Sequence, residues 1–191
     1  MTLTEYPSWF EATEAKSNFE KYLARYKGLP ELKFLQLGAY AGDASVWLLD
    51  NILTDSSSVL YDVDTWEGSD EEVHKTINFK DIYEYYEERV KPYSNIEYFR
   101  MTSYEYLRFD NYLYDFIYVD ADHTAISVLL DGLLSWDLLQ PGGIMAFDDY
   151  EWRSGKGDEF DPAPGVNSVL ARHQGKFDLI HKGWQIWIAK K

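Results

Sequence analysis

Cysteine is absent from the chain of 191 residues. Disulfide bonds, thiolate nucleophiles, zinc–cysteine sites and iron–sulfur clusters are therefore excluded, and the chain suits a reducing compartment. No run of about 18 apolar residues occurs, so no transmembrane helix is expected. Residues 1–10 lack a basic segment followed by an apolar core, so they do not resemble a signal peptide. Together these absences predict a cytoplasmic location.

Basic side chains are also scarce, because 18 Lys and Arg stand against 33 Asp and Glu and give a net charge of −15. A surface this negative repels polyphosphate backbones and anionic lipid headgroups. We therefore expect neither a nucleic acid nor a membrane as partner, and we expect a small molecule and a cation or metal ion instead. Association into a homo-oligomer is compatible with this composition.

The first helix is predicted over residues 8–27, where Ser8 and Glu11 have the spacing of a capping box. Gly28 and Pro30 then end it. Its apolar stripe comprises Phe19, Tyr22, Leu23 and Tyr26, which recur at helical spacing.

After this helix, short apolar segments alternate with helix-like segments. The predicted strands are 34–37, 58–63, 96–99, 114–119, 144–147, 177–180 and 184–188. The predicted helices are 44–53, 70–91 (one helix or a pair of helices), 125–139 and 166–173. A turn is expected at residues 141–143, a loop at 151–164, and a two-residue hairpin turn at Lys182 and Gly183.

This alternation predicts one α/β domain over residues 1–191, with residues 1–30 as an N-terminal helical extension. The expected fold is Rossmann-like and doubly wound, with a mainly parallel seven-stranded sheet that ends in an antiparallel hairpin. Such sheets bind ligands at the carboxyl ends of their strands, so the residues that follow each strand are the candidates for function.

A glycine-containing turn follows the first predicted strand, where Gly38 and Gly42 open a helix. Glycines allow backbone to approach a ligand closely, although a tight strand–helix turn is the simpler explanation. Asp64 ends the second strand, where a carboxylate can accept both hydroxyls of a ribose. After the third strand, Thr102 and Ser103 either meet the edge of an adenine or only start a helix.

Acidic residues gather after the fourth and fifth strands, which should be neighbours. Packed carboxylates repel one another unless a cation or shared protons compensate, and hard oxygen ligands suit Mg²⁺, Ca²⁺ or Mn²⁺. Helix capping by Asp122 is an alternative for one of them, but it does not explain a doubled aspartate before a loop. The group comprises Asp120, Asp122, His123, Asp148 and Asp149.

These segments resemble a known family. Residues 35–42 (LQLGAYAG) are similar to the first motif of class I S-adenosylmethionine-dependent methyltransferases, in the form found in catechol-type O-methyltransferases. Residues 63–68, the segment 120–123, and residues 141–143 with 148–150 resemble metal-dependent O-methyltransferases that act on sugars and other small molecules in bacteria. The resemblance covers residues 32–190.

The resemblance implies S-adenosylmethionine and Mg²⁺, or another divalent cation, as cofactors, and a small-molecule acceptor such as a sugar diol or a catechol. The catalytic base would be His123 or Asp122, and the metal ligands would be Asp120, Asp148 and Asp149. The implied cofactor-binding residues are Gln36, Gly38, Ala39, Tyr40, Gly42, Asp64, Thr65, Trp66, Ser103 and Asp120.

The chain departs from the family pattern at two positions. Gln36 stands where Glu is usual, and Ala44 stands where the catechol branch has Ser. These departures favour one alternative to catalysis, a non-catalytic, methyltransferase-like binding subunit. A hydroxylase-like or nucleotide-binding relative on the same fold is a separate alternative. Retention of the aspartates at the strand ends favours catalysis.

Overall fold

The computed structural model describes residues 6–69 and 74–191. Residues 1–5 of the expected N-terminal extension and residues 70–73 of the expected helix 70–91 lie outside the described residues. Within the described ranges, no helix combines the length and the apolar character that a membrane span requires.

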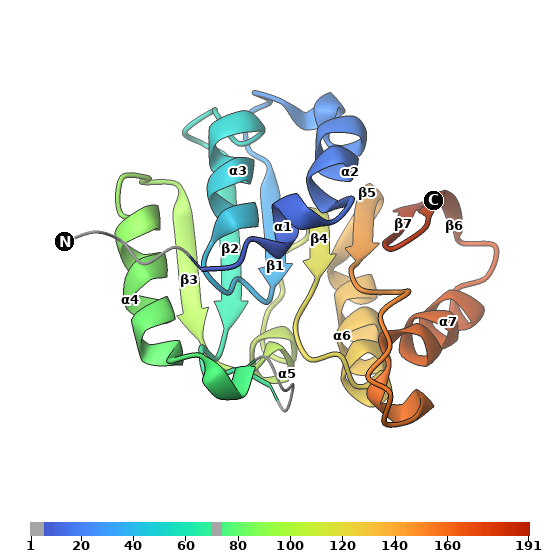
Figure 1. Ribbon diagram of the computed structural model, residues 1–191. Helices are drawn as coiled ribbons and strands as arrows, with labels where there is room; N and C mark the ends of the chain where they lie inside the picture. Colours follow the sequence, from blue (N-terminus) through green and yellow to red (C-terminus); the bar gives the residue numbers. More distant parts are fainter. Residues whose placement is uncertain (1–5, 70–73) are drawn as a thin grey trace.

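A seven-stranded sheet with the order β3-β2-β1-β4-β5-β7-β6 forms the centre of the molecule (Figure 1). Strands β1 to β5 run parallel, and β7 is antiparallel to both of its neighbours. The predicted fold class is therefore confirmed. The strands are β1 (Lys33–Leu37), β2 (Val59–Asp64), β3 (Ile96–Arg100), β4 (Tyr114–Val119), β5 (Leu139–Phe147), β6 (Phe177–Lys182) and β7 (Ile186–Lys190).

Helices cover both faces of this sheet. Helices α1 to α4 pack on one face, and α5 to α7 pack on the other. Strand β1 contributes side chains to the hydrophobic core on each face of the sheet. Phe34 packs with the first group of helices, and Leu35 packs with the second. The helices are α1 (Trp9–Ala12), α2 (Ala15–Tyr22), α3 (Asp43–Asn51), α4 (Phe79–Val90), α5 (Ser103–Leu107), α6 (Ala125–Leu138) and α7 (Pro162–Arg172).

The prediction of one continuous helix over residues 8–27 is wrong. This segment is divided into α1, α2 and a 3₁₀ turn at Ala24–Tyr26, because Thr13 adopts an extended conformation after α1. Ser8 makes no side-chain cap, so the expected capping box does not form. The apolar stripe is nevertheless on the inner side: Phe19, Leu23 and Tyr26 are buried, and Tyr22 is partly buried against the core.

Three boundaries near the C-terminus also differ from the expectation. The expected turn at residues 141–143 is an irregularity within β5, since the register steps from Tyr114 opposite Leu139 to Phe116 opposite Ile144. Helix α7 begins at Pro162 rather than at residue 166. The hairpin is confirmed, but its turn comprises residues 183–185, so β7 begins later than expected.

Candidate functional site

A cavity of about 760 Å³ opens at the carboxyl ends of the parallel strands, where a doubly wound sheet places its ligand. Its walls are the segments that follow β1 to β5, together with α1 and the turn before β7. This volume lies within the range of small-molecule sites. Strands β4 and β5 are hydrogen-bonded neighbours, so the acidic segments that follow them share one side of the cavity.

Gly38 allows the turn after β1 to lie against the end of β4. Its φ is +88°, and a Cβ there would lie 1.8 Å from the carbonyl oxygen of Asp120. The Gly38 amide also donates to Val63, and the Asp120 amide donates to Leu37. Only glycine permits this approach, which brings the turn and Asp120 to the same point of the cavity.

The carboxylate of Asp64 fixes the conformation of this turn. One oxygen accepts the backbone amides of Ala39 and Tyr40 at 2.8 and 2.9 Å, and the other accepts the amide of Trp66 at 2.7 Å. Since a carboxylate oxygen has two lone pairs, the second oxygen can accept one more hydrogen bond. Asp64 lines the cavity with Thr65, and its expected contact with ribose stays a prediction.

Gln36 presents an unused acceptor to this part of the site. Its side chain is 2% exposed and lines the cavity, and its Nε2 donates to the Gly38 carbonyl at 2.9 Å. Its Oε1 is buried without a hydrogen-bond partner. A buried, unsatisfied acceptor is costly unless a ligand pairs with it, so Gln36 suits a ligand that carries a donor such as an ammonium group.

Two expected cofactor contacts do not reach the wall of the cavity. Trp66 is 1% exposed and lies behind the turn, where its indole donates to the Tyr40 carbonyl and packs against Tyr86. Gly42 is the N-cap residue of α3, and a Cβ there would meet the same Tyr86 ring at 2.9 Å. Both residues support the turn from outside the site.

Thr102 and Ser103, which follow β3, both line the cavity, and their expected contact with an adenine stays a prediction. Thr102 starts α5 through a capping box with Glu105. Ser103 lines the cavity, and its hydroxyl donates to Asp131 at 2.6 Å. The sequence reasoning missed Asp131, a carboxyl from the middle of α6 that is 2% exposed. Burial raises the pKa of Asp131 to about 7, and the Ser103 hydrogen bond opposes that rise.

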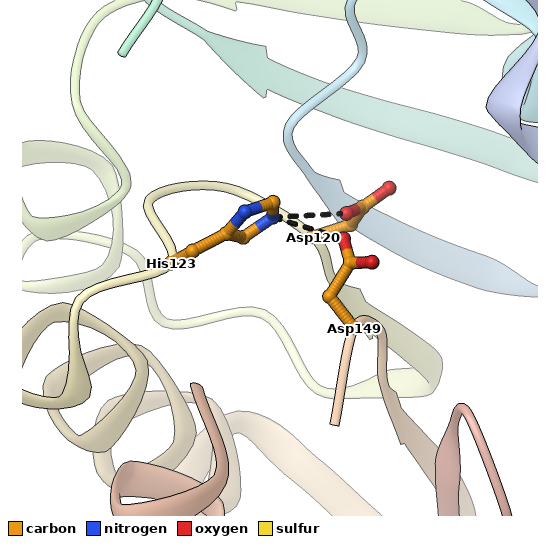
Figure 2. Close-up of side chains that lie close together, drawn as sticks. All are labelled: Asp120, His123 and Asp149. Carbon is orange, nitrogen blue, oxygen red and sulfur yellow. Dashed lines mark ion pairs between the residues drawn. The ribbon is translucent and has the colours of Figure 1, made fainter. Parts of the chain in front are cut away.

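Three side chains converge on the other side of the cavity. Nε2 of His123 lies 3.0 Å from Asp149 and 3.8 Å from Asp120, and Figure 2 shows the imidazole facing both carboxylates. One ligand atom from each residue falls within 4.8 Å of the others, so these atoms can share a single cation. Burial, and then the charge of Asp148, raise the pKa of Asp120 well above its ordinary value.

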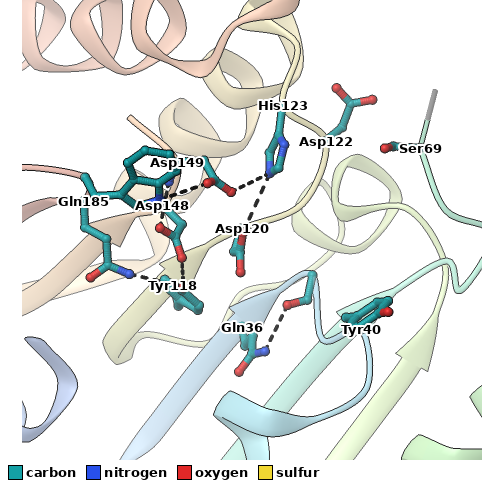
Figure 3. Close-up of polar contacts among 12 residues, drawn as sticks. Gln36, Tyr40, Ser69, Tyr118, Asp120, Asp122, His123, Asp148, Asp149 and Gln185 are labelled. Atoms are coloured by element: carbon teal, nitrogen blue, oxygen red, sulfur yellow. Dashed lines mark hydrogen bonds and ion pairs between the residues drawn. The ribbon is translucent and has the colours of Figure 1, made fainter. Parts of the chain in front are cut away.

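Asp148 is not part of this group. Its carboxylate accepts the hydroxyl of Tyr118 and the amide of Asp149, and Gln185 donates to the same hydroxyl at 3.3 Å (Figure 3). Burial and the charge of Asp149 raise the pKa of Asp148 to about 6. The structure therefore brings His123, rather than Asp148, to Asp120 and Asp149.

Asp122 lies near the mouth of the cavity and is exposed. It does not cap α6, because the capping hydroxyl belongs to Thr124; instead Asp122 accepts the Thr124 amide at 2.7 Å. Two half-buried tryptophans flank the same region. Trp152 packs on His123 with 5.2 Å between ring centroids, and Trp184 donates to Asp149 at 3.0 Å.

The sequence profile of a family described as "Methyltransferase domain" matches residues 35–150, which include the strand ends β1, β2, β3 and β4 and both sides of the cavity. The chain belongs to the methyltransferase-domain family. The matched region ends just after Asp149, so it contains every member of the group formed by Asp120, His123 and Asp149.

Solved structures share the fold of this methyltransferase domain. The O-methyltransferase from Bacillus cereus in complex with S-adenosylhomocysteine (SAH) is 16% identical with a TM-score of 0.61, over 100% of this chain and 94% of that one. The SAH-bound methyltransferase PaMTH1 from Podospora anserina is 14% identical with a TM-score of 0.65, over 97% and 80%. An rRNA methylase from Streptococcus thermophilus is 13% identical with a TM-score of 0.58, over 88% and 92%. No curated protein is significantly similar in sequence.

Proposed function

We propose that the protein transfers a methyl group from S-adenosylmethionine to a hydroxyl group of a small molecule. The observation that carries this proposal is the composition of one cavity. Gln36, Asp64 and Ser103 lie on the side of the first three strands, and Asp120, His123 and Asp149 lie on the side of the next two. A donor and an acceptor of a methyl group need two such adjoining halves.

The residues on the first side fit S-adenosylmethionine. The buried Oε1 of Gln36 would accept the ammonium of its methionine part, and Asp64 would accept a ribose hydroxyl with its remaining lone pair. Similar folds from Bacillus cereus and Podospora anserina hold SAH, the product of this cofactor. The cofactor supplies a methyl group that its sulfonium has already activated, so the chain needs to align the acceptor and remove its proton.

His123 would remove that proton as the new oxygen–carbon bond forms. Asp149 lies 3.0 Å from its Nε2 and would stabilise the imidazolium that results. An imidazole suits this role because its ordinary pKa lies near neutrality. The ring of Trp152 would hold the acceptor side of His123 away from bulk water.

The same group also has the chemistry of a divalent cation site. Two carboxylates and one imidazole are ligands for Mg²⁺ or Mn²⁺. A cation at this point would lower the pKa of the acceptor hydroxyl. Acceptors with two adjacent oxygens, such as a sugar diol or a catechol, would bind the cation through both oxygens. Where His123 ligates the cation, Asp122 is the carboxylate that remains at the mouth of the cavity to take the proton.

The charge of the cavity supports a small acceptor over RNA, although an rRNA methylase shares the fold. Among the described residues that line the cavity there is neither Lys nor Arg. Phosphate groups would meet these carboxylates at close range without a Lys or Arg side chain to compensate their charge. The aspartates in this lining are Asp43, Asp64, Asp120, Asp122, Asp131, Asp148 and Asp149.

Transfer of radiolabelled methyl from S-adenosylmethionine to a panel of catechols and sugar diols tests this function. We expect turnover in the wild type, and a fall in kcat of about a hundredfold or more for His123→Gln, with unchanged affinity for SAH. His181→Gln is the matched control, because His181 lies in β6 and does not line the cavity.

The same assay separates the alternatives. Loss of turnover in EDTA and its recovery with Mg²⁺ would mean that Asp120, His123 and Asp149 bind a cation. Full turnover in EDTA would mean that these residues act through proton transfer by His123 alone. Absence of SAH binding by isothermal titration calorimetry would contradict the proposed function. Binding of SAH without turnover on any acceptor would favour the non-catalytic subunit.

A further inference from the structure

The hydrogen bond between Ser103 and Asp131 has no part in the mechanism above. Ser103 is the first residue of α5, and Asp131 comes from the middle of α6, so the bond joins two helices at the wall of the cavity. The Ser103 Oγ lies 2.6 Å from Asp131 Oδ1. Asp131 Oδ2 is buried without a hydrogen-bond partner.

The direction of this bond determines what Ser103 offers to a ligand. Above its raised pKa of about 7, the Asp131 carboxylate is ionised and only accepts, so the single hydroxyl proton of Ser103 then points to Asp131. The oxygen of Ser103 then has only lone pairs for the cavity, and the free oxygen of Asp131 is an acceptor as well. This corner of the cavity therefore offers acceptors and no side-chain donor from either residue.

The surroundings of Ser103 suit a flat ring. Met101, Tyr104 and Leu130 also line the cavity and are 36%, 47% and 39% exposed. Apolar side chains with a few placed polar atoms are the usual walls for a purine-sized group. A ring that enters this corner would bring one edge to the Ser103 oxygen.

We propose that Asp131 is a positioning residue that holds Ser103 as a hydrogen-bond acceptor, so that this corner selects the exocyclic amino group of adenine and rejects a carbonyl at the same position. This inference rests on the proposed use of S-adenosylmethionine. Adenine has a donor at that position, whereas hypoxanthine has an oxygen, which would face the lone pairs of Ser103. Unpaired acceptors buried against each other weaken binding about tenfold to a hundredfold.

Isothermal titration calorimetry with SAH and with its hypoxanthine analogue, S-inosylhomocysteine, tests the selection. At pH 8.5, above the raised pKa of Asp131 of about 7, the carboxylate is ionised. We expect the wild type to prefer SAH by about tenfold or more. In Asp131→Asn the side-chain amide can donate to Ser103 and release its proton, so the preference should fall toward equality.

Ser103→Ala provides a second variant, and it should lose the preference through weaker binding of SAH. Ser127→Ala is the matched control, because Ser127 is also a cavity-lining serine but is bonded to Thr124, and it should keep the full preference. Equal affinities in the wild type, or a full preference in both test variants, would overturn the inference while SAH binding still supported the proposed function. Failure of the wild type to bind either compound would overturn both.

Discussion

A missing Cβ and a single carboxylate define the turn after β1. Gly38 lies in contact with the Asp120 carbonyl, and Asp64 accepts three backbone amides from the turn and from the segment after β2. Neither residue needs a ligand to explain its type. Both residues shape the turn, and the turn forms part of the cavity wall. Asp64 can therefore contact a cofactor in that cavity as well as hold the turn.

Substitution of Gly38 tests the first of these roles. Gly38→Ala adds the strain of a positive φ and a Cβ placed 1.8 Å from the Asp120 oxygen, so the turn or β4 must move. Gly175→Ala is the matched control, since Gly175 has a φ of +82° and no atom within 4 Å of the added Cβ. We expect the control to lose about 1–2 kcal/mol of the free energy of unfolding in urea, and Gly38→Ala to lose clearly more. Equal losses would contradict the close approach.

Removal of the Asp64 charge tests the second role. Asp64→Asn keeps the shape of the side chain but places an amide group among backbone donors, so at least one of the three hydrogen bonds is lost. We expect the free energy of unfolding to fall by about 1.5–3 kcal/mol and the affinity for SAH to fall at least tenfold. Asp55→Asn, which affects a local turn with Ser57, controls for the charge. Wild-type stability with weak SAH binding would instead restrict Asp64 to ligand contact.

Residue types at the strand ends were predictable, but the directions of their side chains were not. The expected metal ligands included both members of the doubled aspartate, and the structure directs Asp148 to Tyr118 and Asp149 to His123. The strand alternation that could have separated them ends here, because Asp149 has a φ of +55°. Gln185 and Asp131 carried no local signal, since each acts through contacts made by distant parts of the chain.

At the scale of elements, apolar spacing predicted which helices pack on the sheet but not the polar residues that they bury. In α6 the buried face includes Val128 and Trp136, and also Asp131 and Ser135. A polar residue inside an apolar helix is read from sequence as solvent-exposed, and only its partner shows otherwise. The same applies to β2, where the buried Asp62 accepts the Tyr86 hydroxyl of α4 at 2.7 Å.

The contact between Asp62 of β2 and Tyr86 of α4 makes the free energy of unfolding depend on pH. Burial, with a smaller effect of Asp64, raises the pKa of Asp62 to about 7, although hydrogen bonds oppose the rise. The folded state therefore binds a proton at Asp62 more tightly than the unfolded chain, where the value is 3.8. The stabilisation that this proton provides is complete below about pH 4 and is lost as the pH rises through about 7.

Asp62→Asn should remove this dependence, because the amide is neutral and can still accept from Tyr86. Relative to the wild type, the variant should gain up to about 3 kcal/mol in the free energy of unfolding between pH 5 and pH 8, measured by urea denaturation. Asp50→Asn is the matched control, since exposed Asp50 also accepts a tyrosine hydroxyl, from Tyr93. If the free energies of unfolding of the variant and the wild type differed by a constant amount across this range, the raised pKa of the buried Asp62 carboxyl would be contradicted.

At the scale of the whole molecule, the fold followed from the sequence because short, largely apolar segments such as β1 and β4 alternate with helical segments along the chain. Chain order then left few ways to arrange a right-handed parallel sheet. The site followed only in outline, since the fold determines which strand ends meet but not the rotamers there. The net charge of −15 extends into the cavity, where seven aspartates lie among the lining residues.

This charge predicts that the protein does not bind RNA, even though an rRNA methylase shares its fold. Fluorescence anisotropy with a labelled single-stranded RNA and a labelled RNA hairpin, at about 0.15 M salt and with SAH present, should show no saturable binding up to about 50 µM. Phosphate would have to approach a chain that carries 33 acidic against 18 basic residues, and the cavity offers it no Lys or Arg among the described lining residues. Micromolar binding that weakens steeply with added salt would mean that a basic surface outweighs the net charge, and an RNA acceptor would then replace the small molecule.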